Sequence, residues 1–184
     1  MNRPRTHHSA KEIAAVPIEG RDHIQGPIDA PIALVEYGDY QCPHCGAAYP
    51  IVKALQKRLG KHLRFAFRNF PLSESHEFAE HAAEAAEAAA DQGKFWEMHD
   101  LLFENQDALD DDSLANYATD LGLDSIRLKR EVMSGSRAER VREDFRSGLR
   151  NGVNGTPTFF INGERYDGAF DFEAILAALS NKTM

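Results

Sequence analysis

Residues 32–45 read Ile-Ala-Leu-Val-Glu-Tyr-Gly-Asp-Tyr-Gln-Cys-Pro-His-Cys and contain both cysteines of the chain, Cys42 and Cys45. An apolar run precedes the pair, and apolar residues at helical spacing follow it. Pro43 suits the first turn of a helix, because its missing N–H removes no bond there. A cysteine at a helix start lies among unpaired backbone N–H groups at the positive end of the helix dipole, which favours the thiolate. The pattern therefore predicts a nucleophilic thiol suited to disulfide exchange.

The sequence around the cysteines predicts a strand, a helix and a second strand. Residues 32–37 are mainly apolar and lie between Pro31 and Gly38, as expected of a buried strand. Helical spacing continues over residues 43–59, and residues 63–70 alternate between apolar and basic or small side chains. A strand, helix, strand unit implies a parallel pair with a right-handed crossover.

Glu36 interrupts the first predicted strand six residues before Cys42. Burial would raise the pKa of its carboxyl group and make it a candidate proton carrier for a nearby thiol. A glutamate near the end of a strand can also reach solvent and have no such role. Spacing alone leaves both interpretations open.

A second informative segment, residues 154–163, reads Asn-Gly-Thr-Pro-Thr-Phe-Phe-Ile-Asn-Gly. Its Thr156-Pro157 pair alone predicts only a turn, but the apolar run that follows predicts a strand that ends in an Asn-Gly hairpin turn. Residues 164–166 would form the returning strand. Asp171 is then a plausible N-cap for a final helix.

Together these features resemble the DsbA-like branch of the thioredoxin superfamily, over roughly residues 28 to 180. The segments that carry the resemblance are Glu36, the Cys-Pro-His-Cys motif at 42–45, Arg-Asn-Phe-Pro-Leu at 68–72, Phe-Trp with later His, Leu and Phe within 95–103, and Gly-Thr-Pro-Thr-Phe at 155–159. The resemblance implies an α/β fold, namely a thioredoxin fold with an inserted helical subdomain. It also implies that the peptide bond before Pro157 is cis, that Pro157 lies against the cysteine pair and that Glu36 is buried beneath the pair.

The resemblance also implies a role for each candidate residue. Cys42 would be the exposed nucleophile, and Cys45 would be buried and would resolve the mixed disulfide, with Glu36 carrying its proton through water. His44 could donate a hydrogen bond to the Cys42 sulfur and lower its pKa, or it could simply face solvent. Thr156 and Pro157 would bind the backbone of the substrate.

The expected organisation is a polar N-terminal arm over residues 1–27, a thioredoxin-fold unit over 28–72 and 150–184, and an inserted subdomain of four or five helices over 73–149. His76 and His81 in the insert faintly resemble a metalloprotease motif. Their spacing is five residues rather than four, which separates them by about 140° around a helix. We therefore predict ordinary surface histidines.

Composition excludes several classes of function. A formal net charge of −8 argues against nucleic-acid binding, which needs a basic face. No stretch has the apolar length of a membrane span or of a signal peptide, so the expected compartment is the cytoplasm, with the periplasm as the alternative if a leader was removed. A structural zinc site needs four ligands, and the chain has no second cysteine pair. We expect no metal and no cofactor.

The predicted function is thiol-disulfide exchange with protein or peptide substrates, as a reductase or isomerase in a reducing compartment. Glutathione or a thioredoxin-type reductant is the candidate electron partner. A non-catalytic thioredoxin-fold module that binds a partner protein or senses redox state is the rival interpretation. A kappa-class transferase relative is disfavoured, because such relatives typically keep a serine or a single cysteine where this chain keeps the intact pair.

Overall fold

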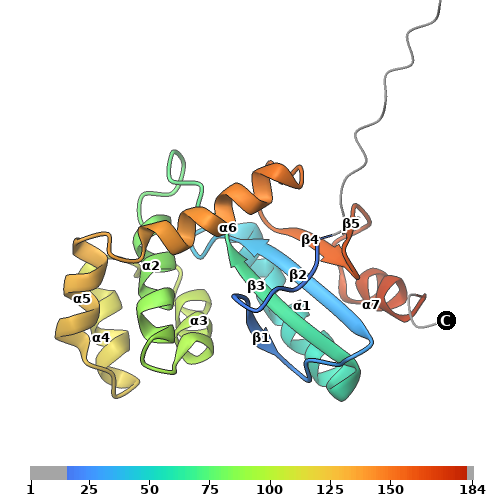
Figure 1. Cartoon of the computed structure of the whole chain (residues 1–184), viewed down its shortest axis with the longest axis horizontal. Coiled ribbons are helices and arrows are strands. Elements are labelled where there is room, and N and C mark those ends of the chain that lie inside the picture. The colour runs from blue at the N-terminus through green and yellow to red at the C-terminus, as the bar shows by residue number, and fades with distance from the viewer. Residues whose placement is uncertain (1–15, 182–184) are drawn as a thin grey trace, which may run out of the picture.

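The computed structural model describes residues 16–181, which form a mixed five-stranded sheet and seven α-helices (Figure 1). The strands are β1 (His23–Gln25), β2 (Ile32–Gly38), β3 (Leu63–Asn69), β4 (Thr158–Ile161) and β5 (Glu164–Tyr166). The helices are α1 (Pro43–Leu59), α2 (Ala79–Ala90), α3 (Phe95–Glu104), α4 (Asp111–Asp120), α5 (Ser125–Met133), α6 (Ala138–Arg150) and α7 (Phe172–Ser180). The α/β class and the thioredoxin fold predicted from the sequence are confirmed.

Strand β2 occupies the centre of the sheet, whose order is β1-β3-β2-β4-β5. It runs parallel to β3, with Glu36 opposite Phe67, and antiparallel to β4, with Tyr37 opposite Thr158. Helix α1 connects β2 to β3, so the predicted strand, helix, strand unit is confirmed. The predicted hairpin of β4 and β5 and the N-cap at Asp171 are also present.

The two faces of β2 support different cores, because successive side chains of a strand point to opposite sides of the sheet. Leu34 belongs to the larger core, which α1 and α7 share, whereas Val35 and Tyr37 belong to a smaller core on the other face. Glu36 has the parity of Leu34. Its carboxyl group is therefore directed to the side of the sheet on which α1 carries the cysteines.

Helix α6 packs on the face opposite α1. Phe145 stacks on Phe70 with ring centroids 4.3 Å apart, and the Ser147 hydroxyl lies 2.8 Å from that of Tyr37. A Cβ atom at Gly148 would lie 2.7 Å from the Phe70 ring, so the glycine permits this close approach. The last helix of the predicted insert thus also covers the sheet.

Five helices, α2 to α6, lie between β3 and β4 in the chain, and α2 to α5 stand beside the sheet (Figure 1). Helix α2 begins at Ala79, because the chain first forms a turn in which the Ser75 N–H donates to the Leu72 carbonyl at 2.8 Å. Its alanines are buried on nearly every side. Small side chains let the surrounding helices approach α2 closely.

The N-terminal region differs from the predicted polar arm over residues 1–27. Strand β1 pairs antiparallel with β3, and Val16 is buried in the smaller core. Asp22 and Arg68 form a bidentate ion pair at 2.7 and 2.8 Å, with both side chains almost wholly buried. The three-residue strand is too short and too polar to show a period, which explains why the sequence did not predict it. Residues 1–15 of the arm lie outside the described residues.

We expect Asp22→Ala to lower the free energy of unfolding by about 3–5 kcal/mol, because it leaves the buried Arg68 guanidinium without its counter-charge. Glu97→Ala is the matched control. It removes the exposed Lys94–Glu97 ion pair, which also measures 2.8 Å, and should cost about 0–1 kcal/mol. Urea denaturation of the two variants measures both effects, and equal losses would contradict the anchoring role of Asp22.

Candidate active site

The cysteine pair lies at the point where the central strand leads into helix α1. Cys42 is the N-cap residue, Pro43 is the first helical residue, and the Gly46 N–H donates to the Cys42 carbonyl at 3.0 Å. Both cysteines are free thiols. The helix start therefore places the backbone N–H groups of the first turn around the Cys42 sulfur, as the sequence predicted.

The Cys42 thiol is strongly acidified. A hydrogen bond from the Cys45 thiol is the main reason that the pKa of Cys42 falls to about 5. The Thr156 side chain and the backbone N–H groups of Cys45 and His44 also lower this pKa, whereas burial raises it. Cys42 therefore carries a thiolate at neutral pH. The expected exposure of Cys42 is wrong, since the residue is only 3% exposed. Its sulfur lies 3.5 Å from the Thr156 carbonyl, so the loop before β4 covers it.

Cys45 has the opposite character. It is fully buried, and burial is the main cause of its raised pKa, followed by the hydrogen bond to the Cys42 sulfur and the nearby Glu36 carboxyl group. The backbone N–H of Asp39 donates to its sulfur at 3.5 Å and opposes that rise. The two thiols thus differ sharply in acidity, so that only Cys42 is ionised at neutral pH.

Glu36 is buried beneath the pair, as the resemblance implied, and the solvent-facing interpretation is wrong. Its exposed fraction is 2%, and burial followed by repulsion from Cys42 raises its pKa to about 8. Its Oε1 atom has no hydrogen-bond partner within residues 16–181. An unsatisfied carboxyl oxygen in the interior is destabilising, which favours a chemical role for this residue over a structural one.

The loop before β4 meets the cysteines from the other side. The Thr156–Pro157 peptide bond is cis, as the resemblance implied, and the Thr156 carbonyl faces the Cys42 sulfur. The Thr156 hydroxyl is buried, and the Thr156 side chain contributes to the lowered pKa of Cys42. Thr158, the first residue of β4, donates from its hydroxyl to the Gly155 carbonyl at 2.8 Å and closes the turn.

His44 is exposed, and the hydrogen bonds of residues 16–181 include none from its imidazole to Cys42. Its contribution to the acidity of Cys42 comes from its backbone N–H. The predicted side-chain donation is therefore absent from this conformation. Of the two interpretations left open by the sequence, the structure matches the solvent-facing one for the imidazole.

Sequence reasoning missed three residues that hold the motif. Gln106, between α3 and α4, donates from Nε2 to the carbonyls of Tyr40 and Cys42 at 2.7 and 2.9 Å. Asp39 is buried and accepts three hydrogen bonds. One of these comes from His76, so this histidine is not the ordinary surface residue that we predicted. No sequence period could reveal these contacts, because all three residues lie in loops.

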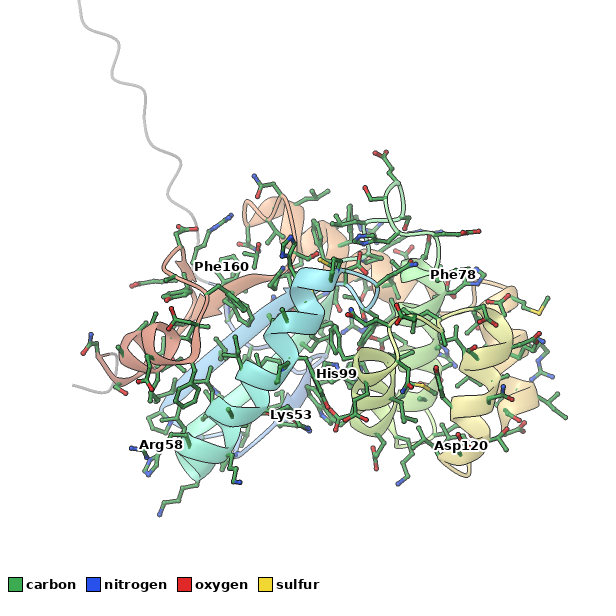
Figure 2. All side chains as sticks on the ribbon, turned by 180° about the vertical axis from the view of Figure 1, so that it is seen from behind. Lys53, Arg58, Phe78, His99, Asp120 and Phe160 are labelled. Carbon is green, nitrogen blue, oxygen red and sulfur yellow. The ribbon has the colours of Figure 1, made fainter. Side chains whose placement is uncertain are left out.

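An aromatic cluster supports the same segment from the insert. His99 of α3 is buried, and desolvation is the main cause of the lowering of its pKa to about 3. The neutral imidazole nitrogen Nδ1 lies 3.1 Å from the hydroxyl of Tyr40. Figure 2 shows His99 where α3 approaches α1, and its ring lies edge-on to Phe67 and Phe103. The Tyr40 side chain is thereby fixed two residues before Cys42.

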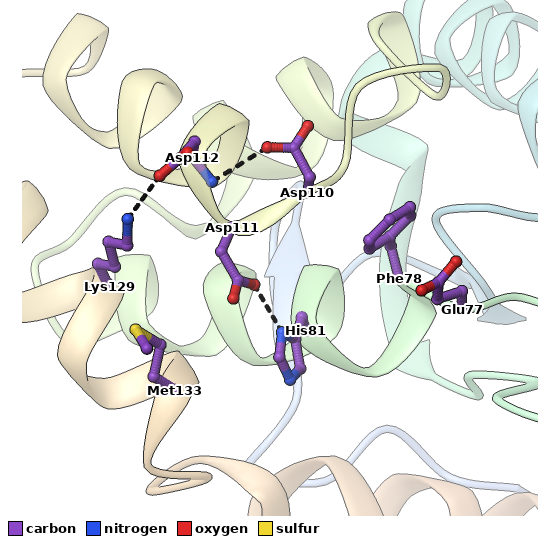
Figure 3. Close-up of a pocket in the computed structure, with 8 residues that line it drawn as sticks. All are labelled: Glu77, Phe78, His81, Asp110, Asp111, Asp112, Lys129 and Met133. Carbon is purple, nitrogen blue, oxygen red and sulfur yellow. Dashed lines mark hydrogen bonds and ion pairs between the residues drawn. The ribbon is translucent and has the colours of Figure 1, made fainter.

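Two surface pockets share Phe78. The first, of about 430 Å³, adjoins the cysteine motif and is lined by Gln41, Pro43, His76, Phe78, Gln106, Asp107 and Leu109. The second, of about 460 Å³, lies among α2, α4 and α5 and is rich in carboxylates (Figure 3). There His81 contacts Asp111, and Lys129 contacts Asp112.

Residues 16–181 contain no group of three or more side chains able to hold a metal ion.

Sheet order, the cis-proline loop and the cysteine pair at the start of α1 together define a DsbA-like thioredoxin fold. The chain belongs to the thioredoxin family, whose model matches residues 19–181. It resembles the crystal structure of oxidised BdbD from Bacillus subtilis with a TM-score of 0.82 and 25% identity, over 92% of this chain and 97% of that one. A thioredoxin-like oxidoreductase from Silicibacter pomeroyi shares the fold, with a TM-score of 0.78 and 24% identity over 90% and 93% of the two chains. The DsbA-like resemblance is confirmed.

Curated relatives of the chain are much longer proteins. It is 45% identical to the Na(+)/H(+) antiporter NhaA 1 of Salinispora arenicola over 167 residues, which are 90% of this chain and 26% of that protein. The Na(+)/H(+) antiporter NhaA 3 of Salinispora tropica gives 45% identity over 89% and 25% of the two chains. The chain thus spans about a quarter of these relatives. Between residues 16 and 181, the helices are all too short or too polar to cross a bilayer.

We expect the thiolate absorbance of reduced protein to appear with a midpoint near pH 5, the pKa of Cys42. Because this pKa is lowered on folding, the thiolate stabilises the reduced protein above the ordinary thiol pKa of about 8.5, and this stability is lost as the pH falls through about 5. Cys45→Ala removes the main cause and should raise the midpoint. An ultraviolet pH titration of both proteins measures this, and a wild-type midpoint near about 8 would contradict it.

Proposed function

We propose that this protein is a thiol-disulfide oxidoreductase that exchanges disulfides with protein or peptide substrates. The observation that carries the proposal is the opposite acidity of its two thiols, an ionised Cys42 beside a protonated and buried Cys45. Such a pair provides one nucleophile for attack and one reserve thiol for release. The DsbA-like fold supports the same class of reaction.

The first step is attack on a substrate disulfide. The Cys42 thiolate forms a bond to one substrate sulfur, the substrate disulfide breaks, and the other substrate sulfur leaves as a thiolate that takes a proton from solvent. Thr156 and Pro157 lie beside the reacting sulfur. We propose that they bind the substrate backbone and align its disulfide with the Cys42 sulfur.

The second step releases the substrate. Cys45 transfers its proton to Glu36 through a water molecule, and its thiolate attacks the Cys42 sulfur. The mixed disulfide breaks, the second substrate thiolate leaves, and two electrons have passed from the cysteine pair to the substrate. Formation of the mixed disulfide removes the Cys42 charge, which is the second cause of the raised pKa of Glu36. Loss of this charge lowers the pKa of Glu36 in the mixed disulfide. Its carboxyl group is then more readily ionised, and only the ionised form can accept the proton of Cys45.

The direction of the net reaction depends on the compartment. A stabilised thiolate makes a couple oxidising, and strongly oxidising members of this superfamily lie near about −120 mV, whereas a reducing cytosol lies near about −220 mV or lower. The gap of about 100 mV is worth about 4.7 kcal/mol for two electrons. We propose a cytoplasmic protein that rests as the dithiol and acts as a reductase or isomerase, with glutathione or a thioredoxin-type protein as its reductant. In the periplasm, the alternative compartment, the same couple would act as an oxidase.

Insulin reduction tests the proposed activity. Wild type with excess dithiothreitol should precipitate insulin chains faster than dithiothreitol alone, and Cys42→Ser should be inactive. Cys45→Ala should accumulate a mixed disulfide, because it lacks the thiol that releases the substrate. Turbidity and mass spectrometry measure these outcomes. A folded wild-type protein without turnover would favour the rival interpretation, a non-catalytic binding or sensing module.

The resting redox state tests the proposed direction. Acid quenching of unstressed cells followed by thiol alkylation should find the pair mostly as the dithiol, because the gap of about 100 mV favours reduction by more than about a thousandfold. Cys42→Ser provides a reference that cannot form the internal disulfide. A predominant Cys42–Cys45 disulfide in wild type would contradict the proposed role, and cell fractionation would then show whether the compartment is the reason.

A further inference from the structure

We infer that His76 is a positioning residue for the second step, because through Asp39 it holds the backbone N–H that stabilises the Cys45 sulfur. The inference rests on the proposed thiol-disulfide exchange and assigns a role to a residue outside the cysteine motif and the cis-proline loop. His76 lies in the connection between β3 and α2, and the contact from Asp39 to Cys45 lies at the end of β2.

The Asp39 carboxylate is completely buried and is held by donors from two loops. Its Oδ1 atom accepts from the Gln41 N–H at 2.8 Å. Its Oδ2 atom accepts from the Leu72 N–H at 2.8 Å and from His76 Nδ1 at 2.7 Å. Two of these three donors are backbone N–H groups that any residue except proline would supply. The imidazole of His76 is the side-chain donor, and its Nδ1 must carry the proton in this arrangement.

The main chain of Asp39 contacts both cysteines. Its N–H donates to the Cys45 sulfur at 3.5 Å, and its carbonyl accepts from the Cys42 N–H at 3.1 Å. The N–H contact lowers the pKa of Cys45, against the larger effect of burial. The orientation of one residue therefore affects the thiol that must ionise in the second step. The groups that acidify Cys42 are different ones, namely Cys45, Thr156 and the N–H groups of the first helical turn.

His76 can be replaced without removing the connection between the two loops. The Leu72 N–H still reaches Asp39, and the Phe78 N–H donates to Gln41 Oε1 at 2.7 Å. The His76 side chain is 19% exposed at the edge of the pocket beside Pro43, so its removal leaves little empty space in the core. Its loss should relax the Asp39 carboxylate towards the two remaining donors and weaken the N–H contact to Cys45.

Three variants separate this role from a general effect on the fold. His76→Leu removes the donor, and His76→Asn keeps an N–H donor close to the position of Nδ1. His81→Leu is the matched control, because His81 Nδ1 also contacts an aspartate, Asp111 at 2.6 Å, in the pocket of Figure 3. Asp39→Asn is a second way to remove the contact if His76→Leu does not fold, since a carboxamide cannot accept hydrogen bonds at both of its terminal atoms.

The experiment is a single turnover of the reduced protein with a peptide disulfide that carries a fluorophore and a quencher. Quenched-flow sampling and mass spectrometry follow the formation and the decay of the mixed disulfide separately. We expect His76→Leu to slow the decay about tenfold, the effect of one lost hydrogen bond, and to leave the formation rate unchanged. His76→Asn should restore most of the decay rate, and His81→Leu should match wild type in both steps.

Each result has a distinct meaning. Three results would overturn the inference. They are a wild-type decay rate in His76→Leu, equal slowing of both steps in that variant, and failure of His76→Asn to restore the decay rate. A wild-type protein that neither forms a mixed disulfide nor reduces the peptide would instead contradict the proposed function itself. The two failures are therefore distinguishable in one set of traces.

Discussion

The double pairing of strand β2 is the constraint on which the site depends. Parallel pairing with β3 requires a crossover, and helix α1 makes this crossover with Cys42 as its N-cap and Cys45 in its first turn. Antiparallel pairing with β4 brings Thr158 opposite Tyr37, so the loop that ends in Pro157 arrives where β2 ends. Segments more than a hundred residues apart in sequence thus meet at one sulfur. Neither pairing alone would place the Thr156 carbonyl against Cys42.

The same strand explains how a carboxyl group comes to lie under the thiols. Strand periodicity directs Glu36 to the α1 side, and its neighbours on the two flanking strands are Phe67 and Phe159. The chain thereby accepts an unsatisfied buried oxygen, a feature that is destabilising and that natural sequences retain mainly where chemistry needs it. On the opposite face, the buried Arg68 guanidinium forms an ion pair with Asp22 and donates from Nη1 to the Tyr37 hydroxyl at 2.8 Å. Other buried polar atoms between residues 16 and 181 also lack a hydrogen-bond partner, among them Asn69 Oδ1, so the significance of the unpaired Glu36 oxygen comes from its position beneath the thiols.

Much of the fold was predictable, because its main elements have a clear period. Strand β2, helix α1, strand β3 and the hairpin of β4 and β5 follow from alternation, helical spacing and turn residues. The parts that were not predictable depend on contacts between distant loops. Asp39 and His76 are 37 residues apart, and Gln106 is 64 residues from Cys42, with no periodic pattern at either end. The sequence placed Pro157 beside the cysteines but not the burial of Cys42, which depends on the approach of the Thr156 carbonyl to within 3.5 Å of the sulfur across 114 residues of sequence.

The inserted helices serve the motif through three separate contacts, each from a different part of the insert. His76 enters from the connection before α2, His99 from the middle of α3 and Gln106 from the loop after it. All three contact residues 39–42, which connect β2 to α1. His76 and His99 contact the side chains of Asp39 and Tyr40, whereas Gln106 contacts backbone carbonyls. A minimal strand, helix, strand unit lacks these supports. The insert therefore constrains the geometry of Cys42 and Cys45. In the proposed function, changes in its loops would alter the reactivity of the two thiols without any contact with the substrate.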